Sequence, residues 1–101
     1  EFDAVSCHAL AQVGAAVVGT GRLLPDGHIG RMAVLAGWRG QGVGAALLWA
    51  LIDEARRRGM ARVVLNAQTH ALGFYARFGF SPEGGEYEEA GLPHRTMHRA
   101  L

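Results

Sequence analysis

A cluster of glycines between an apolar stretch and an amphipathic stretch constrains this chain more than any other feature. Residues 37–44 read Gly-Trp-Arg-Gly-Gln-Gly-Val-Gly. The apolar residues 29–35 before them predict a strand, and the 3.6-residue periodicity of residues 43–58 after them predicts a helix. The first turn of a helix presents N–H groups that have no partner inside the helix, and the helix dipole adds positive charge there. The segment therefore predicts an anion-binding turn.

Periodicity and turn signals give the remaining elements. Strands are expected at residues 4–12, 15–24, 29–35, 61–65, 86–89 and 94–99, and helices at 43–58 and 69–77. The order β-β-β-α-β-α-β-β predicts an α/β domain with a mixed central sheet and flanking helices. Residues 29–65 should form a right-handed parallel crossover.

Three local expectations accompany this order. Residues 32–34 should be buried on both faces of their strand. Thr69 should cap the second helix. The first helix should bury one stripe, which consists of Val43, Ala46, Leu47, Ala50, Leu51 and Ala55.

Composition bounds the class of protein. The 101 residues suggest a single domain spanning 1–101, and the 50% hydrophobic content can supply a core. The net charge of +1 gives no reason to expect nucleic acid or an anionic membrane surface as a partner. Cys7 is the only cysteine, so no intrachain disulfide can form. Since no apolar run reaches the length of a membrane span and residues 1–3 do not resemble a signal peptide, we expect a cytoplasmic location.

Several kinds of phosphate-binding loop compete for residues 37–44. A Walker loop requires Lys-Ser/Thr where Val43-Gly44 stands. A Rossmann turn fits Gly40, Gly42 and Ala45, but it expects an acidic residue at the end of the next strand, where this chain has Asn66. A glycine-rich corner with no ligand is a further interpretation of so short a motif. Residues 39–44 match in full the Gln/Arg-x-x-Gly-x-Gly/Ala signature and so resemble the loop of the GNAT N-acetyltransferases.

A second motif supports that resemblance. Residues 71–80 are similar to the GNAT pattern Ala-x-x-x-Tyr-x-x-x-Gly-Phe, on the helix where the family places it. Residues 30–34, 65–68 and 93–97 look like the small bacterial ElaA-like subgroup, so the resemblance covers nearly the whole chain. The family usually opens with a strand and one or two helices before the hairpin, and we expect these front elements to be missing here.

The resemblance implies acetyl-CoA as cosubstrate, with no metal. The pyrophosphate would be held by Arg39, Gly40, Gln41, Gly42, Val43 and Gly44. The strand backbone at Met32, Ala33 and Val34 would hold the pantetheine arm, and the N–H of Val34 or a neighbour would polarise the thioester carbonyl. Asn66 and Gln68 would bond the pantetheine amides or a water, although Asn66 is nearly as well suited to cap a helix.

The resemblance also implies that Tyr75 is the general acid. A phenol with a pKa of about 10 can protonate a thiolate whose pKa is about 8.5, although a packing role would be the ordinary interpretation of an aromatic residue beside Phe74. The general base is open between His94, His28 and Glu83, with His94 placed first. His28 lies roughly where some members of the superfamily carry a basic glutamate. Either histidine could instead be an ordinary surface residue.

The predicted function is N-acetyl transfer from acetyl-CoA to a primary amine by direct transfer. The alternatives are a catalytically inactive CoA-binding or regulatory module and, less well supported, a small Rossmann-like dinucleotide binder. The acceptor cannot be read from the sequence: a polyamine, an amino sugar, a drug, a peptide or a protein lysine all fit. We also expect a homodimer formed through the terminal strand at residues 94–101, taken as an edge strand.

Overall fold

A computed structural model describes residues 7–101 of the chain. Residues 4–6 of the first expected strand lie outside the described residues. The elements are β1 (Cys7–Val13), β2 (Ala16–Leu23), β3 (Ile29–Val34), a 3-10 turn η1 (Ala36–Trp38), α1 (Val43–Arg57), β4 (Arg62–Gln68), a second 3-10 turn η2 (Thr69–Ala71), α2 (Leu72–Ala76), β5 (Ser81–Glu89) and β6 (Leu92–Ala100). The order expected from the sequence is confirmed.

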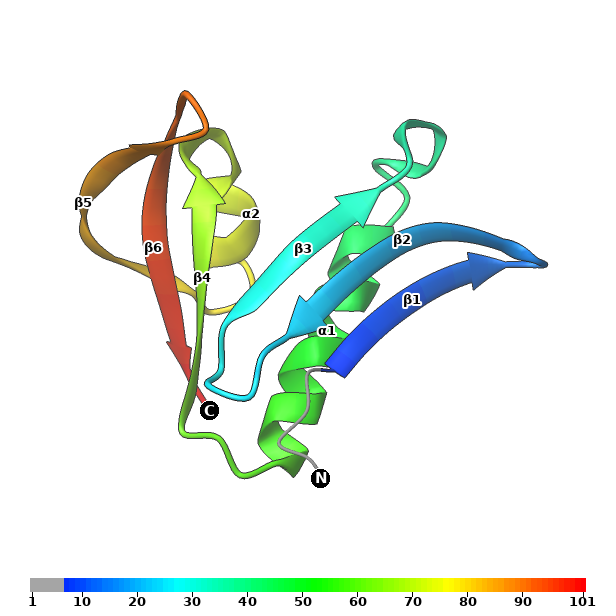
Figure 1. Cartoon of the computed structure of the whole chain (residues 1–101), viewed down its shortest axis with the longest axis horizontal. Coiled ribbons are helices and arrows are strands. Elements are labelled where there is room, and N and C mark those ends of the chain that lie inside the picture. The colour runs from blue at the N-terminus through cyan, green and yellow to red at the C-terminus, as the bar shows by residue number, and fades with distance from the viewer. Residues whose placement is uncertain (1–6) are drawn as a thin grey trace.

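The strands form two antiparallel sheets, β1-β2-β3 and β4-β6-β5. One parallel bridge between His28 and Val64 joins them, and the Val64 N–H donates to the Gly27 carbonyl at 3.0 Å beside it. From that point β3 and β4 diverge, so the two sheets form a V (Figure 1). The mixed sheet expected from the sequence is therefore present as two antiparallel halves that meet in parallel at a single bridge.

A bulge in β3 lies close to this point of divergence. Gly30 pairs with Arg22 and Ala33 with Thr20, so Arg31 and Met32 together oppose the single residue Gly21. A bulge bends its strand and increases the local twist. Gly21 accommodates the bulge because a Cβ at that position would lie 2.7 Å from the Met32 sulfur and 3.0 Å from Leu51 Cδ1.

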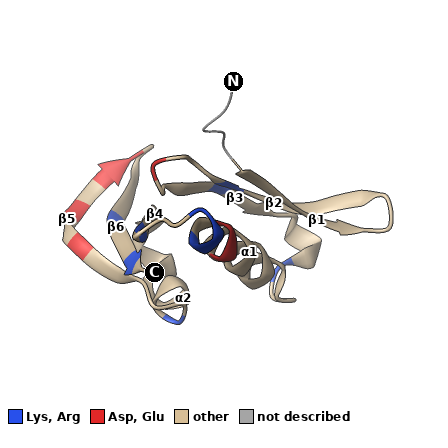
Figure 2. Ribbon diagram, turned by 90° about the horizontal axis from the view of Figure 1, so that it is seen from below, with Lys and Arg blue, Asp and Glu red and all other residues tan. Residues whose placement is uncertain are grey.

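The core lies between the two sheets and the helices. α1 covers one face of the first sheet close to the junction, and α2 lies on the same side against the second sheet (Figure 2). The buried side chains of α1 are Leu47, Leu48, Leu51, Ile52 and Ala55. They meet buried side chains of the second sheet, which are Val63, Leu65, Ala67 and Met97.

The stripe predicted for α1 is partly wrong. Ala46 and Ala50 are exposed, whereas Leu48 and Ile52 are fully buried. The physical reason is the position of the helix, which contacts β1, β2 and β3 on one side and β4 on the other. A helix at such a junction buries a wider and rotated stripe than a helix packed on a single flat sheet.

Three further expectations need correction. Ala33 is exposed and its neighbours Met32 and Val34 are half-buried, because one face of β3 is not covered by packed side chains. Thr69 makes no side-chain cap, since the chain passes through η2 before α2 begins. The terminal strand β6 is not an edge strand, because it pairs with β4 on one side and β5 on the other.

Gly19 on β2 lies where α1 approaches closely. A Cβ there would lie 2.8 Å from Val43 Cγ1 and 2.9 Å from Leu47 Cδ1. We expect Gly19→Ala to lower the free energy of unfolding by about 1–3 kcal/mol, the usual cost of overpacking, as measured by urea denaturation. Gly85→Ala is the matched control, because an added Cβ there meets nothing within 4 Å. Equal stability of the two variants would contradict this packing.

Candidate active site

The turn between β3 and α1 exposes its backbone. Gly40 and Gly42 have φ values of 76° and 83°, in the left-handed region that favours glycine, and Gly42 is the N-cap of α1. The Ala46 N–H donates to the Gly42 carbonyl at 3.0 Å and is the first N–H bonded within the helix. The N–H groups of residues 43–45 therefore have no acceptor inside α1. No Cβ covers the turn at either glycine.

Two polar side chains of the turn bond to backbone carbonyls that precede it in the sequence. The Arg39 Nε donates to the Val34 carbonyl at 3.2 Å, and the Gln41 side-chain amide donates to the Gly37 carbonyl at 3.1 Å. Both bonds tie the turn to residues that precede it. Arg39 is thus positioned by the end of β3, and it lines the same hollow as Gly40 and Gly42.

Three adjoining hollows form a groove along β3. The first, about 270 Å³, lies against the turn and the start of α1, and it shares Val34, Arg39, Gly44 and Phe74 with the second. The second, about 480 Å³, follows β3 and shares Met32, Ala71 and Tyr75 with the third. The third, about 320 Å³, lies between β3 and the end of β4. These shared lining residues connect the glycine-rich turn with the hollow beside Tyr75.

Tyr75 lies where the second and third hollows meet. Its ring packs edge-on against Phe74 at 5.1 Å and against Phe80 at 6.1 Å between centroids. Burial raises the pKa of the phenol above its ordinary value of 10.0, so the hydroxyl keeps its proton at neutral pH. Within residues 7–101 this hydroxyl has no hydrogen-bond partner. Tyr75 thus presents a protonated hydroxyl where it lines the groove, while its ring packs against Phe74 and Phe80.

His94 also lines the third hollow. Only 8% of the residue is exposed, and its ring stacks on Tyr87 with centroids 5.9 Å apart. Its Nδ1 lies 2.9 Å from the Leu92 carbonyl, which can only accept, so in the neutral ring Nδ1 carries the proton. Nε2 is left as a basic nitrogen, with no partner among the described residues. The ring of His94 is therefore held in one orientation, with Nε2 available as a hydrogen-bond acceptor.

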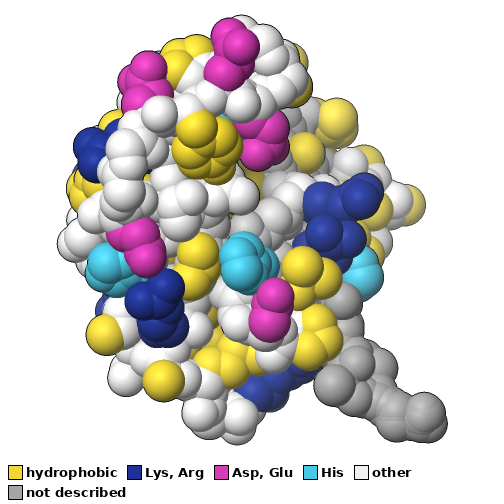
Figure 3. Space-filling view, turned by 60° about the vertical axis from the view of Figure 1, so that its left-hand side comes forward, with side chains coloured by type: hydrophobic (Ala, Val, Ile, Leu, Met, Phe, Trp, Pro, Cys, Tyr) yellow, Lys and Arg dark blue, Asp and Glu magenta, His cyan; other side chains and the backbone are white. Residues whose placement is uncertain are grey.

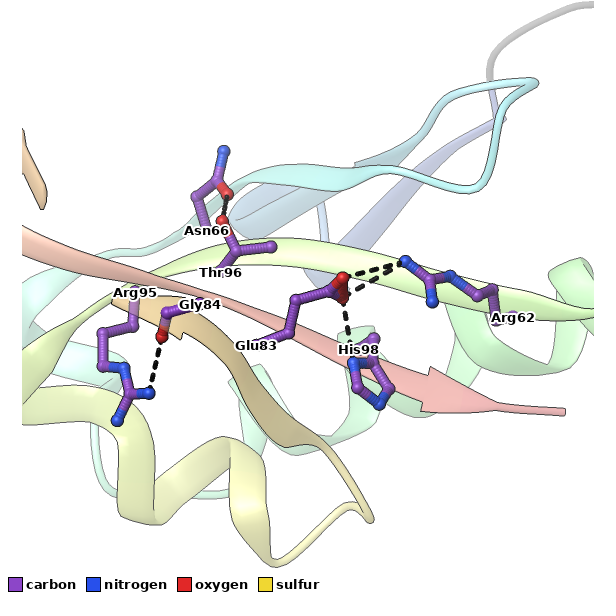
Figure 4. A network of polar contacts seen from close by, with 7 residues as sticks. All are labelled: Arg62, Asn66, Glu83, Gly84, Arg95, Thr96 and His98. Atoms are coloured by element: carbon purple, nitrogen blue, oxygen red, sulfur yellow. Dashed lines mark hydrogen bonds and ion pairs between the residues drawn. The ribbon is translucent and has the colours of Figure 1, made fainter. Parts of the chain in front are cut away.

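Asn66 and Gln68, near the C-terminal end of β4, also line the third hollow. The Thr96 hydroxyl donates to the Asn66 side-chain oxygen at 3.0 Å, which fixes the amide across the sheet (Figure 4). Gln68 Oε1 lies 2.7 Å from His70 Nε2. Gln68 is the N-cap residue of η2 but makes no side-chain capping bond, and Asn66 lies within β4, so the capping alternative for Asn66 is wrong.

The other two candidate bases lie outside these hollows. His28 is exposed and its Nδ1 lies 3.1 Å from Asp26 Oδ2; the His28 backbone N–H and side chain lower the pKa of that carboxyl. Glu83 lies on β5 with its carboxylate engaged by His98 at 2.9 Å and Arg62 at 3.2 Å (Figure 4). The His98 hydrogen bond, aided by Arg62, lowers the pKa of Glu83. The structure brings His94, and neither His28 nor Glu83, to the groove that Tyr75 lines.

Charge is unevenly spread around this face of the molecule. Acidic side chains gather at the top of Figure 3, over the far end of the β5–β6 hairpin, and histidine side chains lie across the middle of the same face. No acidic residue lines any of the three hollows. Across residues 7–101 no three His, Cys, Asp or Glu side chains are grouped to hold a metal ion, and no helix there is long and apolar enough to cross a membrane.

Sequence reasoning missed several groove residues. Arg31, His70, Ala71 and Phe74 line the hollows beside the predicted residues. Ala71 and Phe74 belong to the motif that contains Tyr75, so their proximity could have been foreseen. Arg31 belongs to no such motif, and the bulge of β3 in which it lies is not predicted by periodicity.

Comparison with known proteins identifies the family to which this fold belongs. A model of the acetyltransferase (GNAT) domain family matches residues 4–101. The N-acetyltransferase YjcF of Bacillus subtilis (strain 168) is 36% identical over 101 residues, an alignment that covers 96% of this chain and 72% of YjcF. ElaA of Escherichia coli (strain K12) is 39% identical over 74 residues, covering 72% of this chain and 48% of ElaA.

Solved structures agree with these matches. An acyl-CoA N-acyltransferase from Pseudomonas aeruginosa superposes with a TM-score of 0.85 at 32% identity, over 94% of this chain and 68% of that one. Escherichia coli ElaA superposes with a TM-score of 0.84 at 34% identity, over 93% of this chain and 68% of ElaA. The chain belongs to the GNAT acetyltransferase family, and its likeness to ElaA confirms the expected subgroup. It spans about half to three quarters of the length of these relatives.

The ion pairs of Glu83 make stability depend on pH in a definite direction. Since the folded state lowers the pKa of this carboxyl below its ordinary value of 4.5, the stabilisation is present above pH 4.5 and is lost as the pH falls below it. We expect the difference in unfolding free energy between wild type and Glu83→Gln to be present above pH 4.5 and to shrink below that value, in urea titrations at several pH values. Glu86→Gln, on the same strand, is the control. A difference that stays constant in acid would contradict the assignment.

Proposed function

We propose that this domain transfers the acetyl group of acetyl-CoA to a primary amine by direct transfer in a ternary complex. The observation that carries the proposal is the continuous groove from the anion-binding turn to Tyr75 and His94. The GNAT family supplies acetyl-CoA as the expected cosubstrate. The residues present fit this molecule, because an exposed glycine-rich turn at a helix N-terminus suits a pyrophosphate.

The proposed binding mode follows the groove. The N–H groups of residues 43–45 and the backbone of Gly40, Gln41 and Gly42 would bind the pyrophosphate, with Arg39 beside them. β3 is paired with β2 on one edge, and its other edge is not paired with β4 beyond the bridge at His28. That open edge, at Met32–Val34, would donate and accept the hydrogen bonds of the pantetheine arm. An N–H there, at Val34 or a neighbour, would stabilise charge on the thioester oxygen.

The proposed chemistry uses two residues that line the third hollow, Tyr75 and His94. The amine nitrogen attacks the acetyl carbon, the carbon–sulfur bond breaks, and the amine proton passes to His94 Nε2 directly or through one water. Tyr75 gives its hydroxyl proton to the departing thiolate. Because the ordinary pKa of a thiol is lower than that of a phenol, this transfer is coupled to the loss of the amine proton. Asn66 and Gln68 would orient the pantetheine amides or that water.

The sequence composition also suggests a cytoplasmic location, and the acceptor belongs to one of several amine classes. A homodimer would have to use an available edge, β1 or β5, or an open sheet face, since β6 is internal to its sheet; sedimentation velocity decides between monomer and dimer. An inactive CoA-binding module is the competing function, and turnover of any amine would reject it.

Binding of acetyl-CoA can be tested at Gly44. An added Cβ there makes only ordinary contacts, 3.8 Å from Phe74 and 3.9 Å from Val34, so we expect Gly44→Glu to fold. Its carboxylate would lie at the anion site, and we expect calorimetric affinity for acetyl-CoA to fall by about 100-fold or more through charge repulsion. Gly85→Glu adds the same charge on β5, where an added Cβ meets nothing within 4 Å, and should bind as wild type does. Equal affinity in Gly44→Glu and wild type would reject the proposed site.

The role of Tyr75 is tested by Tyr75→Phe. The variant keeps the ring contacts with Phe74 and Phe80 and loses only the hydroxyl. We expect kcat to fall about 10²–10⁴-fold, with little change in the KM for acetyl-CoA or in the melting temperature. Acetylation should be followed by release of the CoA thiol, with an amine found by screening. An unchanged kcat, where chemistry limits the rate, would leave Tyr75 as a packing residue only.

A further inference from the structure

Arg31 occupies a backbone position that disfavours it. Its φ is 52°, and it is the first residue of the bulge in β3, the position at which such bulges usually carry glycine. A side chain in this left-handed conformation is strained, and strained residues cluster at functional sites. Within residues 7–101 the Arg31 side chain makes no hydrogen bond, whereas its backbone carbonyl accepts from the Thr20 hydroxyl at 3.4 Å. Local packing therefore gives no reason for an arginine here.

Arg31 lies at a cavity that the candidate site residues share. The residue is exposed and lines the third hollow together with Tyr75 and His94. Across residues 7–101 its side chain makes no ion pair and no hydrogen bond. The same hollow contains His70 and no acidic side chain. Its fixed charge is thus positive, at the end of the groove remote from the turn assigned to the pyrophosphate.

We propose that Arg31 binds a carboxylate or phosphate group of the acceptor, so that the acceptor is an amine that carries an anionic group. This inference rests on the proposed acetyl transfer. Arginine recognises both kinds of oxyanion through paired N–H donors. The acidic residues of β5 do not line the hollow, so they offer no site for a polycation there.

The experiment compares two matched pairs of amines. β-Alanine is set against β-alaninamide, and O-phosphoethanolamine against ethanolamine, so that the pairs separate carboxylate from phosphate. The rate of CoA thiol release gives kcat/KM for each amine with wild type, Arg31→Gln and Arg31→Lys. Because the amines differ in intrinsic reactivity, the quantity to compare is the change in the anionic-to-neutral ratio on substitution. Arg77→Gln removes a charge that lies outside the three hollows and is the control.

We expect wild type to favour the anionic member of at least one pair and Arg31→Gln to reduce that ratio about 10-fold or more. Arg31→Lys should retain part of the preference, and Arg77→Gln all of it. An anionic-to-neutral ratio that Arg31→Gln leaves unchanged, or turnover confined to the neutral amines, would overturn this inference alone. If no amine is acetylated although acetyl-CoA binds, the proposed function fails and this inference fails with it.

A second variant separates recognition from folding. Arg31→Gly places glycine where the backbone favours it, so its melting temperature should rise above that of wild type. Its preference for the anionic amine should be lost at the same time. A variant that is both less stable and less selective would show that Arg31 serves the fold, and would overturn the proposal.

Discussion

The single bridge between His28 and Val64 is the contact on which the rest of the site depends. Beyond it, among the described strands, β3 and β4 make no ladder hydrogen bonds, and each continues in its own antiparallel sheet. The bulge at Arg31 and Met32 bends β3 as it leaves the bridge. A continuous parallel pairing of β3 with β4 would satisfy the strand edge internally and would leave no groove. The divergence instead leaves backbone polar groups of β3 open to a ligand.

The helices hold this open arrangement in place. α1 packs against both sheets, with Leu48, Leu51 and Ile52 fully buried, and it approaches β2 so closely that Gly19 and Gly21 have no room for side chains. The same helix begins at Gly42, so its packing also fixes the direction of the free N–H groups. α2 places Tyr75 on the groove wall with Phe74 and Phe80 around its ring. Core packing and site geometry thus use the same elements.

Local signals in the sequence predicted much of this. The glycine spacing and helical periodicity predicted the turn and α1, and the motif around Tyr75 predicted the residue that the structure places at the groove.

Nonlocal features escaped prediction. The bulge has an arginine where glycine would be the usual signal, and the central position of β6 depends on pairing with strands that precede it by up to 38 residues, as in Arg62 with Ala100. The pairing of Glu83 with His98 likewise requires the sheet register. Periodicity could not choose between His28 and His94, because both lie in polar turns or strands, and only the folded chain brings one of them to the hollow.

The most direct test of this account is an NMR titration of the chain with acetyl-CoA, followed through backbone amide shifts. The account predicts the largest shifts at residues 32–34 on the open edge of β3 and at residues 41–45 in the turn and the start of α1, with Tyr75 also affected. Amides of β1 and of the far end of β5 should move little, since they are remote from the groove. Shifts concentrated on β1 or β5, with residues 32–34 and 41–45 unchanged, would contradict the claim that the divergence of β3 from β4 forms the cofactor site.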